Sequence, residues 1–185
     1  MIKFNAEDVE KETIRVLTNK IDNYVAYCIH ETDWVWTSKN SQINQDYCVA
    51  NNVGMSFSFN MGGTIVASKG DVDIALFKTD GWKIGENALL HLKENLQRII
   101  PNIDISGNDL LIDGKYKVAS YASINAGDNL IYTVLHISIN PNVDLIANIC
   151  TKPMIKIPRG LSEYGVSNMD IVKIMTDFED KWFKR

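Results

Sequence analysis

The sequence predicts an α+β fold, a mixed and mostly antiparallel sheet flanked by helices, from two kinds of pattern. Short segments rich in β-branched and aromatic residues are separated by tight-turn signals, of which Asp113-Gly114 is the strongest. Consecutive strands joined by such short hairpins must run antiparallel. Residues 82–100 instead carry apolar side chains three to four positions apart. That spacing predicts a helix whose apolar face covers the sheet.

The first third of the chain is predicted to contain two helices and two strands. A helix should begin at Asn5, as its N-terminal cap, and run to about residue 19. Residues 24–30 (YVAYCIH) and 34–37 (WVWT) have the composition of two strands that pair with each other. A second helix should span residues 42–51, and Gly54 should end it in the left-handed conformation.

The rest of the chain is predicted to alternate strands with helices. Short strands are expected between residues 55 and 77, ahead of the helix at 82–100. A two-residue turn at Asp113-Gly114 should place Lys115 opposite Ile112 and Lys117 opposite Leu110. Further elements are expected as a strand at 130–139, a short helix at 144–149 and an amphipathic helix at 168–182.

Composition favours one globular domain spanning residues 1–185. A chain of 185 residues with 45% hydrophobic and 23% charged residues can bury a sizeable core. The net charge of −4 argues against a nucleic-acid partner, because proteins that bind phosphate backbones usually have a basic face.

Cysteine usage and hydropathy favour a reduced, cytoplasmic setting. Cys28, Cys48 and Cys150 leave one thiol unpaired in any disulfide scheme, and they form no metal-binding pattern, so we expect no metal site built on them. No run of about 18 apolar residues suggests a membrane span, and the first residues lack the pattern of a signal peptide. We therefore expect no membrane partner.

Several segments carry a resemblance to a known family, in the same order and with similar separations. They are SQINQDYCVANNVG (41–54), SFNMGGTIVASKGDVDIALF (58–77), SGNDLLIDGKYKVASYA (106–122) and LHISINPNVDL (135–145). Together they resemble the catalytic domain shared by lipoate-protein ligases, octanoyl transferases and biotin ligases. The resemblance implies the biotin/lipoate ligase catalytic-domain fold.

The same resemblance implies a divergent acyl ligase or acyltransferase. Such an enzyme attaches a lipoate-, octanoate- or biotin-like acid to a protein lysine or another amine, through an activated acyl intermediate. Its partners would be the small carboxylic acid, or its activated ester, and an acceptor protein domain. ATP and Mg would be its cofactors.

The expected site residues follow from the matched segments. Lys117 would be the catalytic lysine, since a cation beside the carboxylate stabilises the activated acyl group. Gly62 and Gly63 would let backbone amides approach the ligand. The polar end of the site would be completed by Asn108, Asp109, Asp71 and Ser120.

Two alternatives remain open on the sequence. In the octanoyl-transferase chemistry a cysteine is the nucleophile, and Cys150 lies in the corresponding region. Most lipoate ligases, however, carry arginines before the glycine loop and a histidine after it, where this chain has Phe57, Ser58 and Ala67. Because these residues are replaced, the alternative is that the chain is a catalytically inactive binding or interaction module.

Overall fold

A central sheet runs through the molecule in the computed structural model, which describes residues 1–37, 43–57, 64–152 and 154–183. Within these residues, the sheet has the strand order β1-β2-β6-β10-β9-β8-β7, and β11 lies alongside β9. Among the described strand pairs of this sheet, only β1–β2 and β9–β11 are parallel, so the predicted mostly antiparallel sheet is confirmed. The strands are β1 (Ile2–Lys3), β2 (Tyr24–Ile29), β6 (Val72–Thr79), β7 (Ile103–Ser106), β8 (Asp109–Ile112), β9 (Tyr116–Asn125), β10 (Leu130–Ile137) and β11 (Ile157–Pro158).

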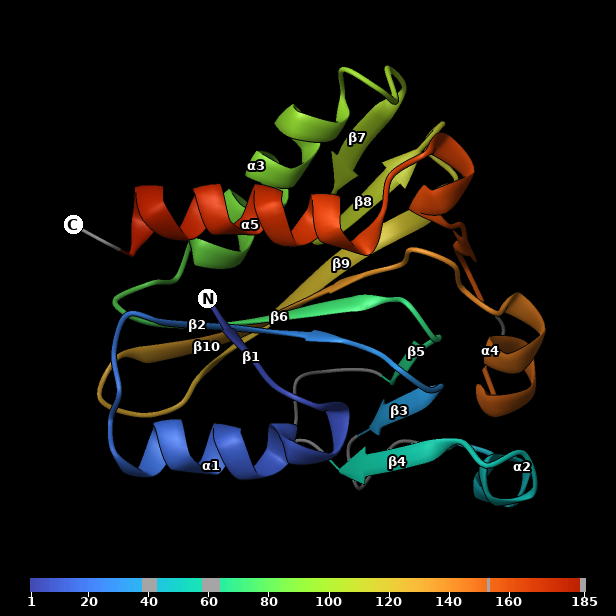
Figure 1. Cartoon of the computed structure of the whole chain (residues 1–185), viewed down its shortest axis with the longest axis horizontal. Coiled ribbons are helices and arrows are strands. Elements are labelled where there is room, and N and C mark those ends of the chain that lie inside the picture. The colour runs from blue at the N-terminus through green and yellow to red at the C-terminus, as the bar shows by residue number, and fades with distance from the viewer. Residues whose placement is uncertain (38–42, 58–63, 153, 184–185) are drawn as a thin grey trace.

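One face of this sheet is covered by α3 (Ile84–Leu96) and α5 (Asn168–Trp182), which lie above it in Figure 1. The predicted apolar stripe of α3 is buried there, with Leu89 and Leu92 packed in the same core as Ile74 and Leu135 of the central strands. Helix α5 begins where the sequence predicts, because Ser167 and Asp170 form a reciprocal capping box.

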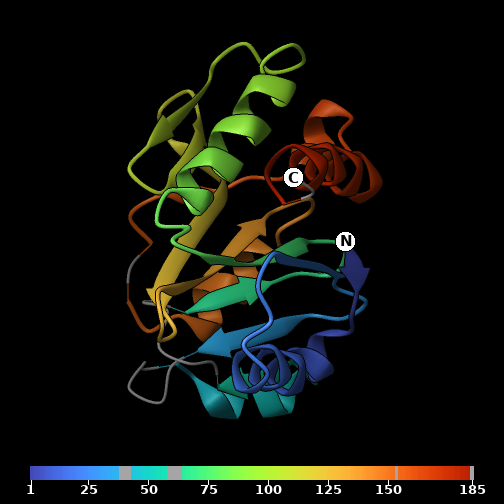
Figure 2. The ribbon, with the colours of Figure 1, turned by 90° about the vertical axis from the view of Figure 1, so that its left-hand side faces the viewer.

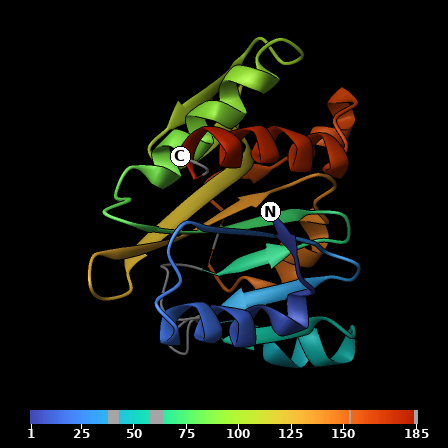
Figure 3. The ribbon, with the colours of Figure 1, turned by 60° about the vertical axis from the view of Figure 1, so that its left-hand side comes forward.

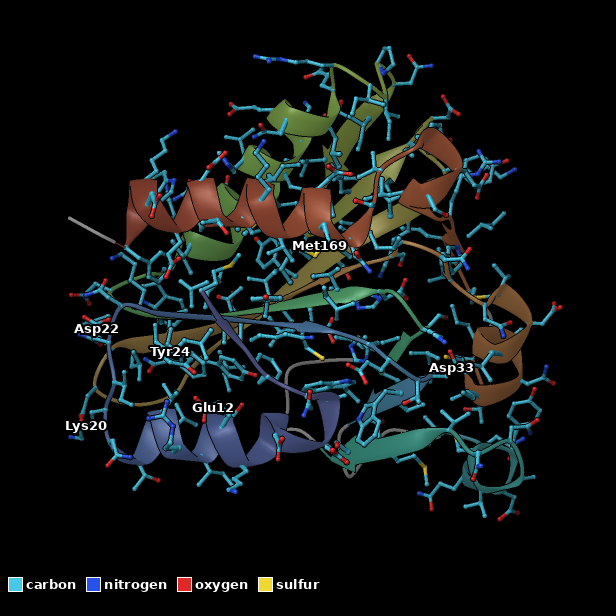
Figure 4. The ribbon with its side chains drawn as sticks, viewed as in Figure 1. Glu12, Lys20, Asp22, Tyr24, Asp33 and Met169 are labelled. Atoms are coloured by element: carbon cyan, nitrogen blue, oxygen red, sulfur yellow. The ribbon has the colours of Figure 1, made fainter. Side chains whose placement is uncertain are left out.

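The opposite face is covered by α1 (Val9–Thr18) and by a second, smaller sheet. Figure 2 shows α1 and α5 nearly end-on, on opposite sides of the central sheet, and Figure 3 gives the same layering from an intermediate angle. Tyr24 on β2 and Glu12 on α1 point toward each other (Figure 4), and the tyrosine hydroxyl donates to the carboxylate. This contact joins α1 to the sheet.

The smaller sheet has the order β4-β3-β5. Beside it lie two short helices that share an apolar cluster with it, in which Cys48, Val66 and Ile149 are buried. The elements of this part are β3 (Trp34–Thr37), α2 (Gln45–Ala50), β4 (Gly54–Phe57), β5 (Ile65–Ala67) and α4 (Val143–Ile149). Two short 3₁₀ helices, η1 (Ala6–Asp8) and η2 (Leu161–Tyr164), complete the elements of the described residues.

Three local predictions in the first third are wrong. Strands β2 and β3 do not pair with each other, because β2 lies between β1 and β6 while β3 pairs with β4 and β5. Helix α1 begins at Val9 after η1, with Asp8 rather than Asn5 at its cap position. Gly54 starts β4, and Asn52 takes the left-handed conformation (φ 57°) instead.

The hairpin between β8 and β9 also differs from its predicted register. Ile112 pairs with Tyr116, so residues 113–115 form the connection and Lys115 lies in the turn. Asp113 and Gly114 both have positive φ, at 54° and 65°. A bulge follows, because Leu110 pairs with Ala119 while Leu111 pairs with Lys117. Lys117 therefore lies opposite Leu111, not Leu110 as predicted.

Among the described residues, none of the helices combines the length and the hydrophobicity that a membrane span requires.

Candidate functional site

A cleft of about 590 Å³ opens beside β9, between the smaller sheet and the segment that contains β11. Its apolar lining comes from β5, α4 and residues 154–158, and its polar lining comes mainly from β8, β9 and β10. The apolar residues are Ile65, Val66, Ile146, Met154, Ile155 and Pro158. The polar residues are Thr64, Asp109, Lys117, Ser120, His136, Ser138, Cys150 and Lys156.

Lys117 shares one carboxylate with a second lysine. Its Nζ lies 3.3 Å from Asp109 Oδ1, and Lys156 Nζ lies 2.6 Å from Asp109 Oδ2. The two lysine side chains are about one-third exposed, whereas Asp109 is 14% exposed. One carboxylate offsets only one of the two ammonium charges, so this corner of the cleft favours an anion.

The position of Lys156 is fixed by the backbone of β9. Strand β11 runs parallel to β9, with Pro158 paired to Lys117, and the amide of Arg159 donates to the carbonyl of Lys117 at 3.0 Å. Lys156 is not among the predicted site residues, because it lies outside the matched sequence segments. The sequence around Lys156 carries one signal, the alternation of apolar and polar residues in Ile155, Lys156 and Ile157. This alternation is typical of a short strand.

A row of polar residues crosses the central sheet at the level of the cleft. Asp109 pairs with Ser120, Ser120 with His136, and His136 with Asp73, on four neighbouring strands. Directly paired residues of antiparallel strands project from the same face. The four side chains therefore share the face that carries the smaller sheet.

Two buried histidines bind the carboxylate of Asp73. His136 Nδ1 lies 2.7 Å from Asp73 Oδ1, and His30 Nε2 lies 2.7 Å from Asp73 Oδ2. All three residues are at most 7% exposed. Neither histidine is among the predicted site residues, because residues 30, 73 and 136 are distant along the chain and only the strand order β2-β6-β10 brings them together.

His136 and Asp73 alter each other's proton affinity. Burial by itself would raise the pKa of Asp73. The charges of His136 and His30 and their hydrogen bonds outweigh burial and hold that pKa well below its usual range. Burial likewise opposes the charged form of His136, but Asp73 and then Asp71 outweigh it and raise the pKa of His136. Asp73 is therefore a carboxylate throughout the physiological range.

Cys150 lines the cleft at the end of α4, where it is partly buried. Burial, followed by the proximity of Cys48, raises the pKa of its thiol. A nucleophilic cysteine instead requires a lowered pKa, which a neighbouring cation or a histidine usually supplies. This environment does not activate the thiol.

Two other predicted residues do not line the cleft. The Asn108 side chain donates to the carbonyl of Tyr121 at 2.8 Å, which fastens β9 to the turn before β8. Buried Asp71 accepts hydrogen bonds from the amides of Ser68 and Ile139, at 2.9 and 2.7 Å, and so ties the turn before β6 to the end of β10. Both side chains hold the backbone around the cleft.

The structure thus brings Lys117, Asp109, Ser120 and Cys150 into one cleft. Gly62 and Gly63, the predicted ligand loop, lie outside the described residues. The next residue along the chain, Thr64, lines the cleft.

The fold has close counterparts among solved structures. P. falciparum LipL1 in complex with lipoate superposes with a TM-score of 0.76 at 15% identity, over 97% of this chain and 61% of that one. A bipartite lipoate protein ligase from Thermoplasma acidophilum, studied with its E2 lipoyl domain, gives 0.75 at 12% identity, over 95% and 80%. The biotin protein ligase from Aquifex aeolicus, in complex with biotin and ATP, gives 0.54 at 12% identity, over 100% and 71%.

At these identities the likeness shows the fold, and the chain spans less than two thirds of the P. falciparum protein. No family model matches the sequence. A search of curated proteins also gives no match.

Proposed function

We propose that this chain, which has the fold of lipoate- and biotin-ligase catalytic domains, joins a small carboxylic acid to an amine. The acid would be of the lipoate, octanoate or biotin kind, and the amine a lysine side chain of an acceptor protein domain. The reaction would pass through an activated acyl group. The observation that carries the proposal is one cleft with an apolar wall and two lysines at a single carboxylate.

The lining suits an acyl group with an anionic head. Ile146, Met154 and Ile155 offer an apolar surface for a hydrocarbon chain or ring. Lys117 and Lys156 would bind the carboxylate of the ligand, because their two positive charges exceed the single negative charge of Asp109. The volume of about 590 Å³ is within the range of small-molecule sites, roughly 300–1,000 Å³.

The chemistry requires activation, because a carboxylate resists attack by an amine. ATP would supply a phosphate leaving group, and Lys117 would stabilise the negative charge that develops at the carboxyl and phosphate oxygens. The two lysines fit such a phosphate, which needs cationic donors. Asp109 is an oxygen ligand of the kind that Mg²⁺ uses together with phosphates.

Thermal stability with candidate ligands provides the first test. A ligand present at 100 times its dissociation constant adds about 2.7 kcal/mol to the free energy of unfolding. We expect a rise in the melting temperature with one of lipoate, octanoate or biotin, and a further rise with ATP and Mg²⁺. No shift with any of them would support the inactive interaction module instead.

Turnover provides the second test, through pyrophosphate release with the stabilising acid. Lys117→Met should lower turnover by about 100-fold, the cost of removing one donor that stabilises transition-state charge. Lys115→Met is the matched control, since Lys115 lies in the same hairpin with its ammonium 5.0 Å from the Tyr116 ring and outside the cleft lining. Equal turnover in the two variants would remove Lys117 from the mechanism.

A further inference from the structure

One ring nitrogen of His136 is held by a hydrogen-bond partner, and among the described residues the other is not. Nδ1 lies 2.7 Å from Asp73 Oδ1, whereas Nε2 lies 3.8 Å from Asp71 Oδ2, beyond hydrogen-bond distance. The residue is only 7% exposed, and it lines the cleft together with Lys117 and Ser120. A buried imidazole at a cleft wall, oriented by a carboxylate, has the arrangement of a general base.

We propose that His136 is a catalytic residue that accepts the proton released when an amine attacks the activated acyl group in this cleft. The inference rests on the proposed function. It adds a catalytic group to those expected from the matched sequence segments, which are Lys117 and Cys150.

The hydrogen bonds determine which nitrogen of His136 carries the proton. Asp73 is a carboxylate, so it accepts at both oxygens, from His136 Nδ1–H and from His30 Nε2–H. With Nδ1–H bound to Asp73, the lone pair of neutral His136 is at Nε2.

The proposed step conserves atoms and charge. The nitrogen of a neutral amine attacks the carbonyl carbon, a C–N bond forms, and the bond from that carbon to the leaving oxygen breaks. The leaving group departs with the electron pair, and the proton of the attacking nitrogen passes to Nε2 of His136. The resulting imidazolium is stabilised by Asp73, to which it remains hydrogen-bonded.

The groups that face His136 set the pH at which it can act. Burial opposes its charged form, Asp73 and then Asp71 favour that form, and Lys117 opposes it. His30 acts on it through Asp73. The net effect is a raised pKa of His136. The amine-transfer rate, divided by the fraction of acceptor amine that is neutral at each pH, should therefore rise with pH to a plateau, with a midpoint above the ordinary histidine value of about 6.5.

The test uses a chemically prepared acyl-adenylate of the acid that stabilises the chain, with two acceptors. One is a lysine side-chain amine, and the other is hydroxylamine, which is already neutral at pH 7 and a stronger nucleophile. We expect His136→Gln to lower transfer to the lysine amine by about 100-fold, in the range of general base catalysis, and to affect hydroxylamine much less.

The controls separate proton transfer from folding. His91→Gln removes a histidine from α3, on the other face of the sheet, where its Nε2 lies 3.1 Å from the carbonyl of Ile174. It should leave both transfer rates unchanged. Asp73→Asn keeps His136 but removes the positioning charge, so the midpoint of the pH–rate profile should fall.

Each outcome decides the inference. Equal losses with the two acceptors in His136→Gln, or an unchanged midpoint in Asp73→Asn, would overturn the role of His136 and leave the proposed function standing. A wild-type chain that neither forms the adenylate nor transfers the acyl group to either amine would overturn both. If His136→Gln does not fold, the Asp73→Asn profile alone decides the question.

Discussion

The Asp73 carboxylate and the His136 imidazole lie directly opposite each other on adjacent strands, with 2.7 Å between Oδ1 and Nδ1. Their contact links two parts of the molecule. Asp73 also binds His30, which lies deeper in the core against the Trp36 ring at a centroid distance of 6.3 Å. His136 reaches the cleft in which Lys117 and Asp109 meet. The core and the candidate site are therefore joined by one hydrogen-bonded carboxylate.

The first prediction concerns the pH dependence of stability. The lowered pKa of Asp73 stabilises the fold above its unfolded pKa of about 3.9, and that stabilisation is lost as pH falls. The raised pKa of His136 stabilises the fold below about pH 6.5, and that stabilisation is lost as pH rises through the folded pKa. Asp73→Asn should cost about 3 kcal/mol near pH 6 and less at pH 9.

Urea unfolding at the two pH values measures this difference. Asp104→Asn is the control, since Asp104 is 76% exposed and its ion pair with Lys93 should contribute less than about 1 kcal/mol. A cost of Asp73→Asn that is the same at pH 6 and pH 9 would contradict the proposed coupling to His136.

The second prediction concerns Lys156, which only the folded chain brings to the site. Lys156→Met should weaken binding of the carboxylic acid about tenfold, as expected when a charged hydrogen bond is lost. Titration by calorimetry, with Lys115→Met as the comparison, measures the effect. An unchanged dissociation constant would show that Lys156 serves only to hold residues 154–158 against Asp109.

The third prediction concerns thiol reactivity. Because the pKa of Cys150 is raised, its alkylation by iodoacetamide at pH 7 should be slower than that of a free cysteine, and should accelerate above pH 9. Intact-mass measurements against Cys150→Ser assign the label. Cys28, whose thiol is buried with a pKa raised to about 12, should react more slowly still. Rapid labelling of Cys150 at pH 7 would return it to the candidates for a nucleophile.

The fourth prediction concerns the contact between β3 and β4. A Cβ added at Gly54 would lie 2.1 Å from the Trp34 ring, so Gly54→Ala should destabilise the chain by about 1–3 kcal/mol. Trp34→Ala in the same chain should recover part of that loss, because the clash disappears. Additive losses in the double variant, measured by urea unfolding, would mean that the two residues do not compete for this space.

Local patterns sufficed for elements whose stabilising contacts are close in sequence. Helix α5 spans the predicted residues because its cap, Ser167 with Asp170, is local, and α3 was recognisable from its apolar periodicity. The hairpin of β8 and β9 was recognised but its register was not, since residues 113–115 and the bulge at Leu110 and Leu111 depend on how the sheet twists and packs.

Local sequence patterns specify the fold class, the main helices and the hairpin that carries Lys117 and Asp109, because propensity, capping and turn chemistry act over a few residues. The approach of Lys156 to Asp109 and the meeting of His30, Asp73 and His136 arise only in the folded chain. Both depend on strand order. Hydrophobic periodicity shows which face of a strand is buried, but it does not specify which strands are neighbours, and these contacts exist only between neighbours.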